Sequence, residues 1–306
     1  MVKGARLAIA GHARRHRYQV DGLFEPGRIR TILESRRLYS AYALGQLGPD
    51  LFPLVDVWRS VEETEGEGAL ALYSRGGLGD AMFTLGDPES LDAILSLHPG
   101  PRQNYASCEP RHLDTMRRYF RFSLERPMLR MGVSLRTFRR PAEPSGHLYI
   151  RRLLATDVRL LNRLYNSEAS PTYYSGQVIE TGCYFGVYED GRLVSVAGTH
   201  VVTPEEGIAV VGNVFTHPNW RGRGLAQVAT GATTSFLLQR CRDVVLTVDP
   251  GNAPAVRAYE RLGYSTDCRL IEAAVTRREL IGAGSYVRRL AARIRGRQEG
   301  TEIVNR

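Results

Sequence analysis

The chain has 306 residues and a mass of 34.1 kDa, which is more than one compact domain usually holds and fits two domains of ordinary size. Hydrophobic residues make up 43% and charged residues 24%, and these globular proportions exclude disordered, collagen-like and disulfide-scaffold proteins. The formal charge of +9 belongs to the ends, because residues 1–30 and 275–306 contribute +5 each and the rest sums to −1. A nucleic-acid-binding face on the core is therefore not expected.

The sequence shows no clear pattern of a membrane span, a secretory signal peptide or a metal site. No apolar run approaches the ~18–20 residues of a membrane span, and the apolar stretch near the N-terminus ends at Gly11, short of a secretory signal. We expect a soluble, cytoplasmic protein. The cysteines form no CxxC pair and no metal-ligand spacing with histidine, so no metal site is expected; they are Cys108, Cys183, Cys241 and Cys268.

The first half of the chain predicts alternating helices and strands. The apolar patterns favour helices over 26–47, 88–97 and 111–120, and strands over 55–60, 68–74, 81–85, 103–107 and 128–137, with a hairpin turn at 75–79. Residues 139–146, with two prolines, a glycine and charged side chains, are typical of a linker. We therefore predict an N-terminal α/β domain over 1–144.

The second half has clearer patterns and predicts a domain over 145–275. Strands are expected at 148–153, 183–188, 192–202, 207–216, 244–248 and 269–275, and helices at 157–166, after 224, and at 254–262. The order of elements parallels that of the first half, which is consistent with a diverged duplication of one fold. Residues 276–306 favour a basic amphipathic helix that packs across the domains or in a homodimer, attaches to a membrane surface, or frays.

A glycine-rich turn links the strand predicted at 207–216 to the next helix. Residues 214–226 read VFTHPNWRGRGLA, in which Gly222 and Gly224 allow close approach of the backbone. Such a turn directs backbone N–H groups outward, and the positive end of the helix adds to them. The turn suits a pyrophosphate, although a glycine-rich turn alone is also compatible with a purely structural role.

A second motif follows the strand at 244–248. Residues 252–264 read NAPAVRAYERLGY, where Asn252 can cap a helix and Pro254 lies in its first turn. Asn252, Ala255 and Tyr259 share one helix face. With these two motifs in this order, residues 148–275 resemble the GNAT superfamily of acetyl-CoA-dependent N-acetyltransferases. The first matches the family's Arg/Gln-x-x-Gly-x-Gly/Ala signature, and the second matches its Asn-x-x-Ala-x-x-x-Tyr-x-x-x-Gly-aromatic signature.

The resemblance implies an α+β fold with a mixed, mostly antiparallel sheet flanked by helices, and acetyl-CoA as co-substrate. It implies that Val214, Phe215 and Thr216 pair with pantetheine and direct an N–H at the thioester carbonyl. Asn252 and Ala255 would contact the pantetheine arm or the phosphates. The pyrophosphate would lie on the backbone of Arg221, Gly222, Arg223, Gly224, Leu225, Ala226 and Gln227.

The resemblance also implies that Tyr259 is the general acid that protonates the CoA thiolate, since a phenol of ordinary pKa is protonated at neutral pH. The sequence shows no obvious general base, because residues 209–211 are apolar where some members carry a glutamate. The candidates left open are Glu180, His200, Glu205, Glu206 and Asp249.

The expected acceptor is a primary amine of a small molecule, an amino acid or a peptide N-terminus. A site without an evident carboxylate suits an amine of low pKa, because a lysine-type amine costs ~4.6 kcal/mol to deprotonate at pH 7 and an α-amine only ~1 kcal/mol. The first half lacks both motifs, and Asp87 and Glu89 would repel phosphate where its own turn would lie. It is expected to be a degenerate GNAT-like domain. The alternative function is an acyl-CoA-binding regulatory module without turnover.

Overall fold

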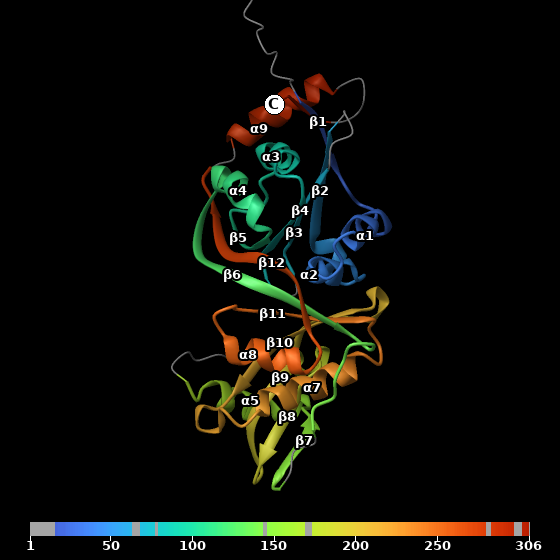
Figure 1. Ribbon diagram of the computed structural model, residues 1–306. Helices are drawn as coiled ribbons and strands as arrows, with labels where there is room; N and C mark the ends of the chain where they lie inside the picture. The colour runs from blue at the N-terminus through green and yellow to red at the C-terminus, as the bar shows by residue number, and fades with distance from the viewer. Residues whose placement is uncertain are drawn as a thin grey trace, which may run out of the picture.

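The computed structural model describes residues 16–62, 68–76, 79–142, 146–168, 173–279, 283–296 and 302–305. Two runs of elements follow one another in the same order, strand, two helices, three strands, helix, strand, helix and strand (Figure 1). The first run comprises β1 (Arg17–Gly22), α1 (Pro26–Glu34), α2 (Ala41–Leu44), β2 (Val55–Glu62), β3 (Ala69–Ser74), β4 (Ala81–Gly86), α3 (Pro88–Leu97), β5 (Gln103–Cys108), α4 (Leu113–Tyr119) and β6 (Phe120–Ser134).

The second run repeats this order and is followed by a short C-terminal addition. It comprises β7 (Leu148–Arg152), α5 (Val158–Tyr165), α6 (Gly176–Thr181), β8 (Phe185–Glu189), β9 (Arg192–Thr203), β10 (Ile208–Thr216), α7 (Leu225–Leu237), β11 (Asp243–Val248), α8 (Ala253–Arg261) and β12 (Ser265–Arg277). The addition is α9 (Ala283–Arg295) and β13 (Glu302–Asn305). The α+β class predicted from the sequence is confirmed.

The last strand of each run is exchanged between the two halves. The described strands form one sheet in the order β13-β1-β2-β3-β4-β5-β12-β6-β11-β10-β9-β8-β7. Thus β12 pairs with β5 of the first half, β6 pairs with β11 of the second, and β6 and β12 pair with each other over most of their length. Figure 1 shows both strands crossing the middle of the molecule. Each half therefore completes the sheet of the other.

Two neighbouring strands of the second half separate at one end. β10 and β11 are parallel and pair only from Ile208 to Val211 on β10. Beyond this point β10 pairs with β9, and a register shift falls between Gly212 and Phe215. Asn213 lies inside the shift with φ 53°, in the left-handed region that few residues other than glycine adopt. Beyond Val211, the end of β10 therefore has no pairing with β11.

Most predicted elements are present, but one predicted strand has different bounds and two elements were not predicted. The strand predicted at 128–137 starts earlier, at Phe120, because it pairs with β12 over this length. The strand β1 and the helix α6 were not predicted; β1 is a short strand that gains its partners from distant segments, Glu302–Asn305 and β2. The turn predicted at 75–79 and the linker at 139–146 lie partly outside the described residues.

The predicted basic helix is present as α9, but the tail ends in a strand. The Nε of Arg288 donates to the carbonyl of Ser96 in α3 at 2.7 Å, and Ala292 is fully buried. β13 then pairs antiparallel with β1. The tail thus packs on the first half. No helix among the described residues is long and apolar enough to cross a bilayer.

A single glycine ends the helix that carries Tyr259. Gly263 has φ +91°, and a Cβ there would lie 1.9 Å from the carbonyl oxygen of Thr137. We expect Gly263→Ala to lower the free energy of unfolding by more than about 1 kcal/mol, because the backbone is strained and the contact is with main chain. Urea unfolding measures this.

The control is Gly27→Ala in α1, where a Cβ meets nothing within 4 Å. Alanine suits a helix better than glycine, so this variant is expected to be as stable as the wild type or slightly more stable. Equal stability of both variants would contradict the role given to Gly263.

Candidate functional site

A cleft of about 800 Å³ lies beside the end of β10 that does not pair with β11. Its walls come from the end of β10, the following turn, the start of α7 and one face of α8. The described lining residues are Glu168, Val214, Phe215, Thr216, Trp220, Arg221, Gly222, Gly224, Leu225, Ala226, Gln227, Asn252, Pro254, Ala255, Arg257, Ala258, Tyr259 and Arg261. The two sequence motifs therefore meet across one cavity.

The glycine-rich turn presents an anion-binding surface to this cleft. Gly222 and Gly224 have φ of +79° and +76°, and a Cβ at either position would meet nothing within 4 Å. Gly224 is the N-cap of α7, whose hydrogen bonding begins with the N–H of Val228 donating to the carbonyl of Gly224. The amides of Leu225, Ala226 and Gln227 thus have no partner within the helix, as in any first turn. Together with the helix dipole they favour a phosphate group.

The second motif places a capped helix on the other side. The Oδ1 of Asn252 accepts from the N–H of Ala255 at 3.2 Å, so the asparagine is the predicted N-cap of α8. This bond orients the first turn towards the cleft. Tyr259 lies further along the same helix face as Asn252 and Ala255, as their spacing predicted, and all three line the cleft.

Tyr259 can act as a proton donor at the inner end of the cleft. Its side chain is buried, and burial raises the pKa of its hydroxyl to about 12. Among the described residues no hydrogen-bond partner holds this hydroxyl, although the side chain lines the cleft. The phenol is therefore protonated at neutral pH and free to donate to a bound molecule.

A second cavity of about 290 Å³ begins at Tyr259 and runs towards the first half. It shares four lining residues with the cleft: Val214, Asn252, Ala255 and Tyr259. Its far wall includes Tyr42 of α2, His200 of β9 and Glu272 of β12. A molecule in the cleft and a second molecule in this cavity would thus meet beside Tyr259.

His200 lies in this cavity within a hydrogen-bond network. Its Nε2 lies 3.1 Å from Oδ1 of Asn213, which also accepts from the hydroxyl of Tyr174, and its Nδ1 lies 2.7 Å from the hydroxyl of Tyr42. Because an amide oxygen only accepts, Nε2 carries the proton and Nδ1 accepts from Tyr42. Burial is the main cause that lowers the pKa of His200. The imidazole is therefore neutral at pH 7.

Gly212 provides the space for this ring. A Cβ at Gly212 would lie 2.4 Å from Nε2 of His200. The next residue, Asn213, is the one with positive φ, and its side chain holds both the imidazole and Tyr184, which accepts from Nδ2 at 2.8 Å. The irregular segment of β10 thus opens the cleft and positions His200.

A buried cation lies beneath the second cavity. Arg130 of β6 is fully buried, and its guanidinium carbon lies 4.9 Å from the centre of the Tyr42 ring. Its Nη1 donates to Oγ1 of Thr247 on β11. The positive charge opposes the rise in the pKa of Tyr42 that burial causes, and it contributes to lowering the pKa of His200. It favours neutral or anionic groups in the cavity above it.

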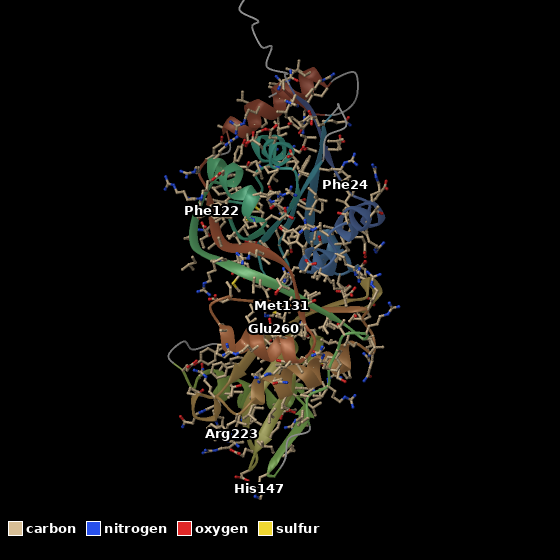
Figure 2. The ribbon with its side chains drawn as sticks, in the orientation of Figure 1. Phe24, Phe122, Met131, His147, Arg223 and Glu260 are labelled. Carbon is tan, nitrogen blue, oxygen red and sulfur yellow. The ribbon has the colours of Figure 1, made fainter. Side chains whose placement is uncertain are left out.

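One predicted cofactor residue turns away from the cleft. The guanidinium of Arg223 pairs with Glu189, to which the indole of Trp220 also donates (Figure 2 labels Arg223). Arg221 lies at the cleft, where its Nη2 is 2.7 Å from Oε1 of Glu168. The remaining residues predicted to hold the cofactor all line the cleft.

Most of the candidate general bases lie outside the cleft and the second cavity. Glu180 and Glu205 are exposed and line neither cavity, and Glu206 forms a bidentate ion pair with Arg30. Asp249 lines the second cavity, but its Oδ1 accepts from the N–H of Gly251 in the turn before α8. Of the five, His200 is the one held inside the second cavity by side-chain bonds.

Sequence reasoning missed Glu272 and Tyr42. Glu272 lies in a strand predicted correctly, opposite Ser107 of β5 and Arg126 of β6. Nothing in a single strand indicates which half it will pair with, so no local signal could have placed this carboxylate in the second cavity.

Residues 150–264 match the family model described as the Acetyltransferase (GNAT) family. A mycothiol acetyltransferase of Thermobispora bispora is 30% identical over 205 residues, which cover 64% of this chain and 65% of that protein. Another, from Mycolicibacterium paratuberculosis, is 29% identical over 157 residues, 44% of this chain and 47% of that protein. The chain thus spans less than two thirds of the length of either relative.

Solved structures share the fold. A GCN5-related N-acetyltransferase from Kribbella flavida has a TM-score of 0.54 at 18% identity and covers 80% of this chain and 95% of its own. One from Sphaerobacter thermophilus has a TM-score of 0.54 at 16% identity, covering 85% of this chain and 95% of its own. These matches extend over both halves.

The lowered pKa of His200 predicts a pH dependence of stability. Between this pKa and the value near 6.5 of the unfolded chain, the unfolded state binds more protons, so stability falls as the pH is lowered through this range. We expect His200→Gln to flatten the decrease in unfolding free energy between pH 7.5 and 5.5, measured by urea unfolding.

His147→Gln is the matched control, since this side chain is 88% exposed at the far tip of the second half (Figure 2). It should retain the wild-type slope. A wild-type slope in His200→Gln as well would show that His200 does not titrate differently in the folded state.

Proposed function

Because residues 150–264 form a domain of the GNAT acetyltransferase family, we propose that this chain transfers the acetyl group of acetyl-CoA to a primary amine. The observation that carries the proposal is the meeting of the cleft and the second cavity at Tyr259. We assign residues 145–275 to cofactor binding and catalysis, and residues 1–144 to the acceptor side. The described elements of the tail, α9 and β13, pack against the first half.

The chemistry of the cleft supports acetyl-CoA as the co-substrate. The first-turn amides of α7, with Gly222 and Gly224 beside them, would hold the pyrophosphate. The end of β10 has no pairing with β11, so backbone groups of Val214 and the N–H of Thr216 remain for the pantetheine amides, whereas the carbonyl of Thr216 accepts from Nε of Arg221 at 3.2 Å. An N–H directed at the thioester oxygen would stabilise the negative charge that develops there.

The reaction conserves atoms and charge. The amine nitrogen bonds to the acetyl carbon and loses a proton, while the carbon–sulfur bond breaks and the sulfur gains a proton. The hydroxyl of Tyr259 supplies the proton that the sulfur gains. Tyr259 is then reprotonated by solvent or by the proton that the acceptor loses. The raised pKa of Tyr259 keeps it in the acid form needed for this step.

The acceptor must reach this point as a neutral amine. Arg130 beneath the cavity disfavours a second positive charge, and His200 remains neutral beside it. Glu272 is the carboxylate that the sequence did not reveal, and it can bind the ammonium form, whose proton then passes to solvent and leaves the neutral amine. Because the relatives are mycothiol acetyltransferases, amines related to mycothiol belong among the acceptors to be tested.

Tyr259→Phe tests the assignment of the acid. We expect kcat to fall by about 10²-fold, because proton transfer by a positioned acid contributes on this scale, while acetyl-CoA affinity stays near that of the wild type. Thiol release reports kcat, and calorimetry reports affinity.

Tyr264→Phe is the control, since this buried tyrosine pairs with Oγ1 of Thr234 at 2.7 Å and lines neither cavity. It should lose stability but keep kcat. Unchanged turnover in Tyr259→Phe would refute the acid. Tight acetyl-CoA binding without turnover on any amine would instead favour a regulatory module.

Gly224→Ala tests the phosphate surface. Its φ of +76° strains an alanine, and relief of this strain would shift the backbone at the start of α7. We expect calorimetry to show about tenfold weaker acetyl-CoA binding, which is the loss of about one hydrogen bond.

Gly191→Ala matches it in strain, with φ +78° and nothing within 4 Å of its Cβ, but lies in the turn between β8 and β9. Both variants should lose similar stability, and only Gly224→Ala should lose affinity. Equal affinities would contradict the placement of the phosphates on α7.

A further inference from the structure

A third cavity, of about 330 Å³, continues the path from Tyr259 into the first half. It shares Tyr42, His200 and Glu272 with the second cavity. Its other described lining residues come from α2, the turn after it, β3, β4 and β5, and are Ala43, Gln46, Leu72, Ser74, Gly76, Ala81, Met82, Phe83, Tyr105 and Ser107. Its volume is that of a site for a small organic molecule.

The walls of this cavity are mainly apolar. Leu72, Met82 and Phe83 are each 5% exposed or less and belong to the core of the first half. The polar pair deeper in the wall is satisfied within the protein, because Oγ of Ser74 donates to Oε1 of Gln46 at 2.9 Å. The cavity therefore offers apolar contact and few polar groups that need a ligand.

A carboxylate stands where the second and third cavities meet. The hydroxyl of Tyr105 donates to Oε2 of Glu272 at 3.1 Å. In the part of the chain that the structure describes, no arginine, lysine or histidine forms an ion pair with Glu272. Its other oxygen is thus available to an ammonium group, which prefers an ionised acceptor.

We propose that the acceptor is a primary amine with an apolar body, an alkylamine or arylalkylamine rather than a polyhydroxylated amine. The body lies among Leu72, Met82 and Phe83, and the amino group lies at Glu272, from which it reaches the thioester beside Tyr259. This proposal rests on the function proposed above and specifies the acceptor class. It follows from the continuity of the three cavities and from the charge at their junction.

The exchange of strands makes this acceptor site. Glu272 belongs to β12 of the second run but is held between β5 and β6, opposite Ser107. The apolar walls belong to the first run. Neither half contains both parts of the site.

The first test is calorimetric binding of amines to the 306-residue chain saturated with CoA, which needs no turnover. The probes are propylamine, butylamine, pentylamine, hexylamine and phenethylamine, with ethanolamine and glucosamine as polar counterparts. Each added methylene should tighten binding two- to fourfold until the cavity is filled. Hexylamine that binds no tighter than propylamine, or glucosamine that binds more tightly than both, would overturn the proposal.

The second test is the kinetics of acetylation with the same amines. In the wild type, kcat/KM should rise along the series and exceed that of glucosamine. Ser107→Phe fills the cavity beside Glu272, and it should reduce kcat/KM for hexylamine at least tenfold and change that for ethanolamine less than twofold. Equal losses on both amines would contradict the cavity as the acceptor site.

Glu272→Gln keeps the shape and removes the charge. We expect KM to rise about tenfold for every amine, the value of a lost charged hydrogen bond, with acetyl-CoA affinity unchanged. Glu260→Gln makes the same change at an exposed position of α8 (labelled in Figure 2). Glu260 lines none of the three cavities, so this variant should keep the wild-type KM. An unchanged KM in Glu272→Gln would refute the ammonium contact.

The two proposals fail in different ways. If the wild type does not bind acetyl-CoA and releases no thiol, the acetyltransferase assignment fails, whatever the amines do. If acetyl-CoA binds and amines are acetylated without preference for apolar chains, the assignment stands and the acceptor class is wrong.

Discussion

The pairing of β6 with β12 is the constraint on which the rest of the molecule depends. A sheet edge leaves a row of unpaired backbone groups, and here β5 and β11 each obtain their missing neighbour from the other half of the chain. The two halves therefore cannot complete their sheets separately. The exchange also determines which charged residues lie between the two halves, because it brings Arg130 of β6 and Glu272 of β12 to the same junction.

The shape of the site also depends on the point at which β10 and β11 stop pairing. β10 leaves β11 after Val211, and Asn213 adopts a positive φ at the register shift. The strain is balanced by side-chain bonds from Asn213 to His200, Tyr174 and Tyr184. The same few residues thus open the cleft on one side and organise the acceptor cavity on the other.

Charge is divided between the two sides of Tyr259. The cleft side offers the positive end of α7 to an anion. The acceptor side combines a buried cation, a neutral imidazole and a carboxylate at the mouth of an apolar cavity. This arrangement suits an amine that arrives charged at Glu272 and reacts as the neutral form nearer Arg130.

The sequence by itself determined the class of fold, most helices and strands of the second half, and the two motifs around Gly224 and Tyr259, because turns, caps and helix faces depend on residues a few positions apart. It also indicated that the halves share one order of elements. The strand exchange, the length of β6, the strands β1 and β13, and the positions of Glu272 and Tyr42 were decided only by tertiary structure. Strand partners are chosen by backbone groups that every residue carries, so the side-chain pattern of one strand does not identify its neighbour.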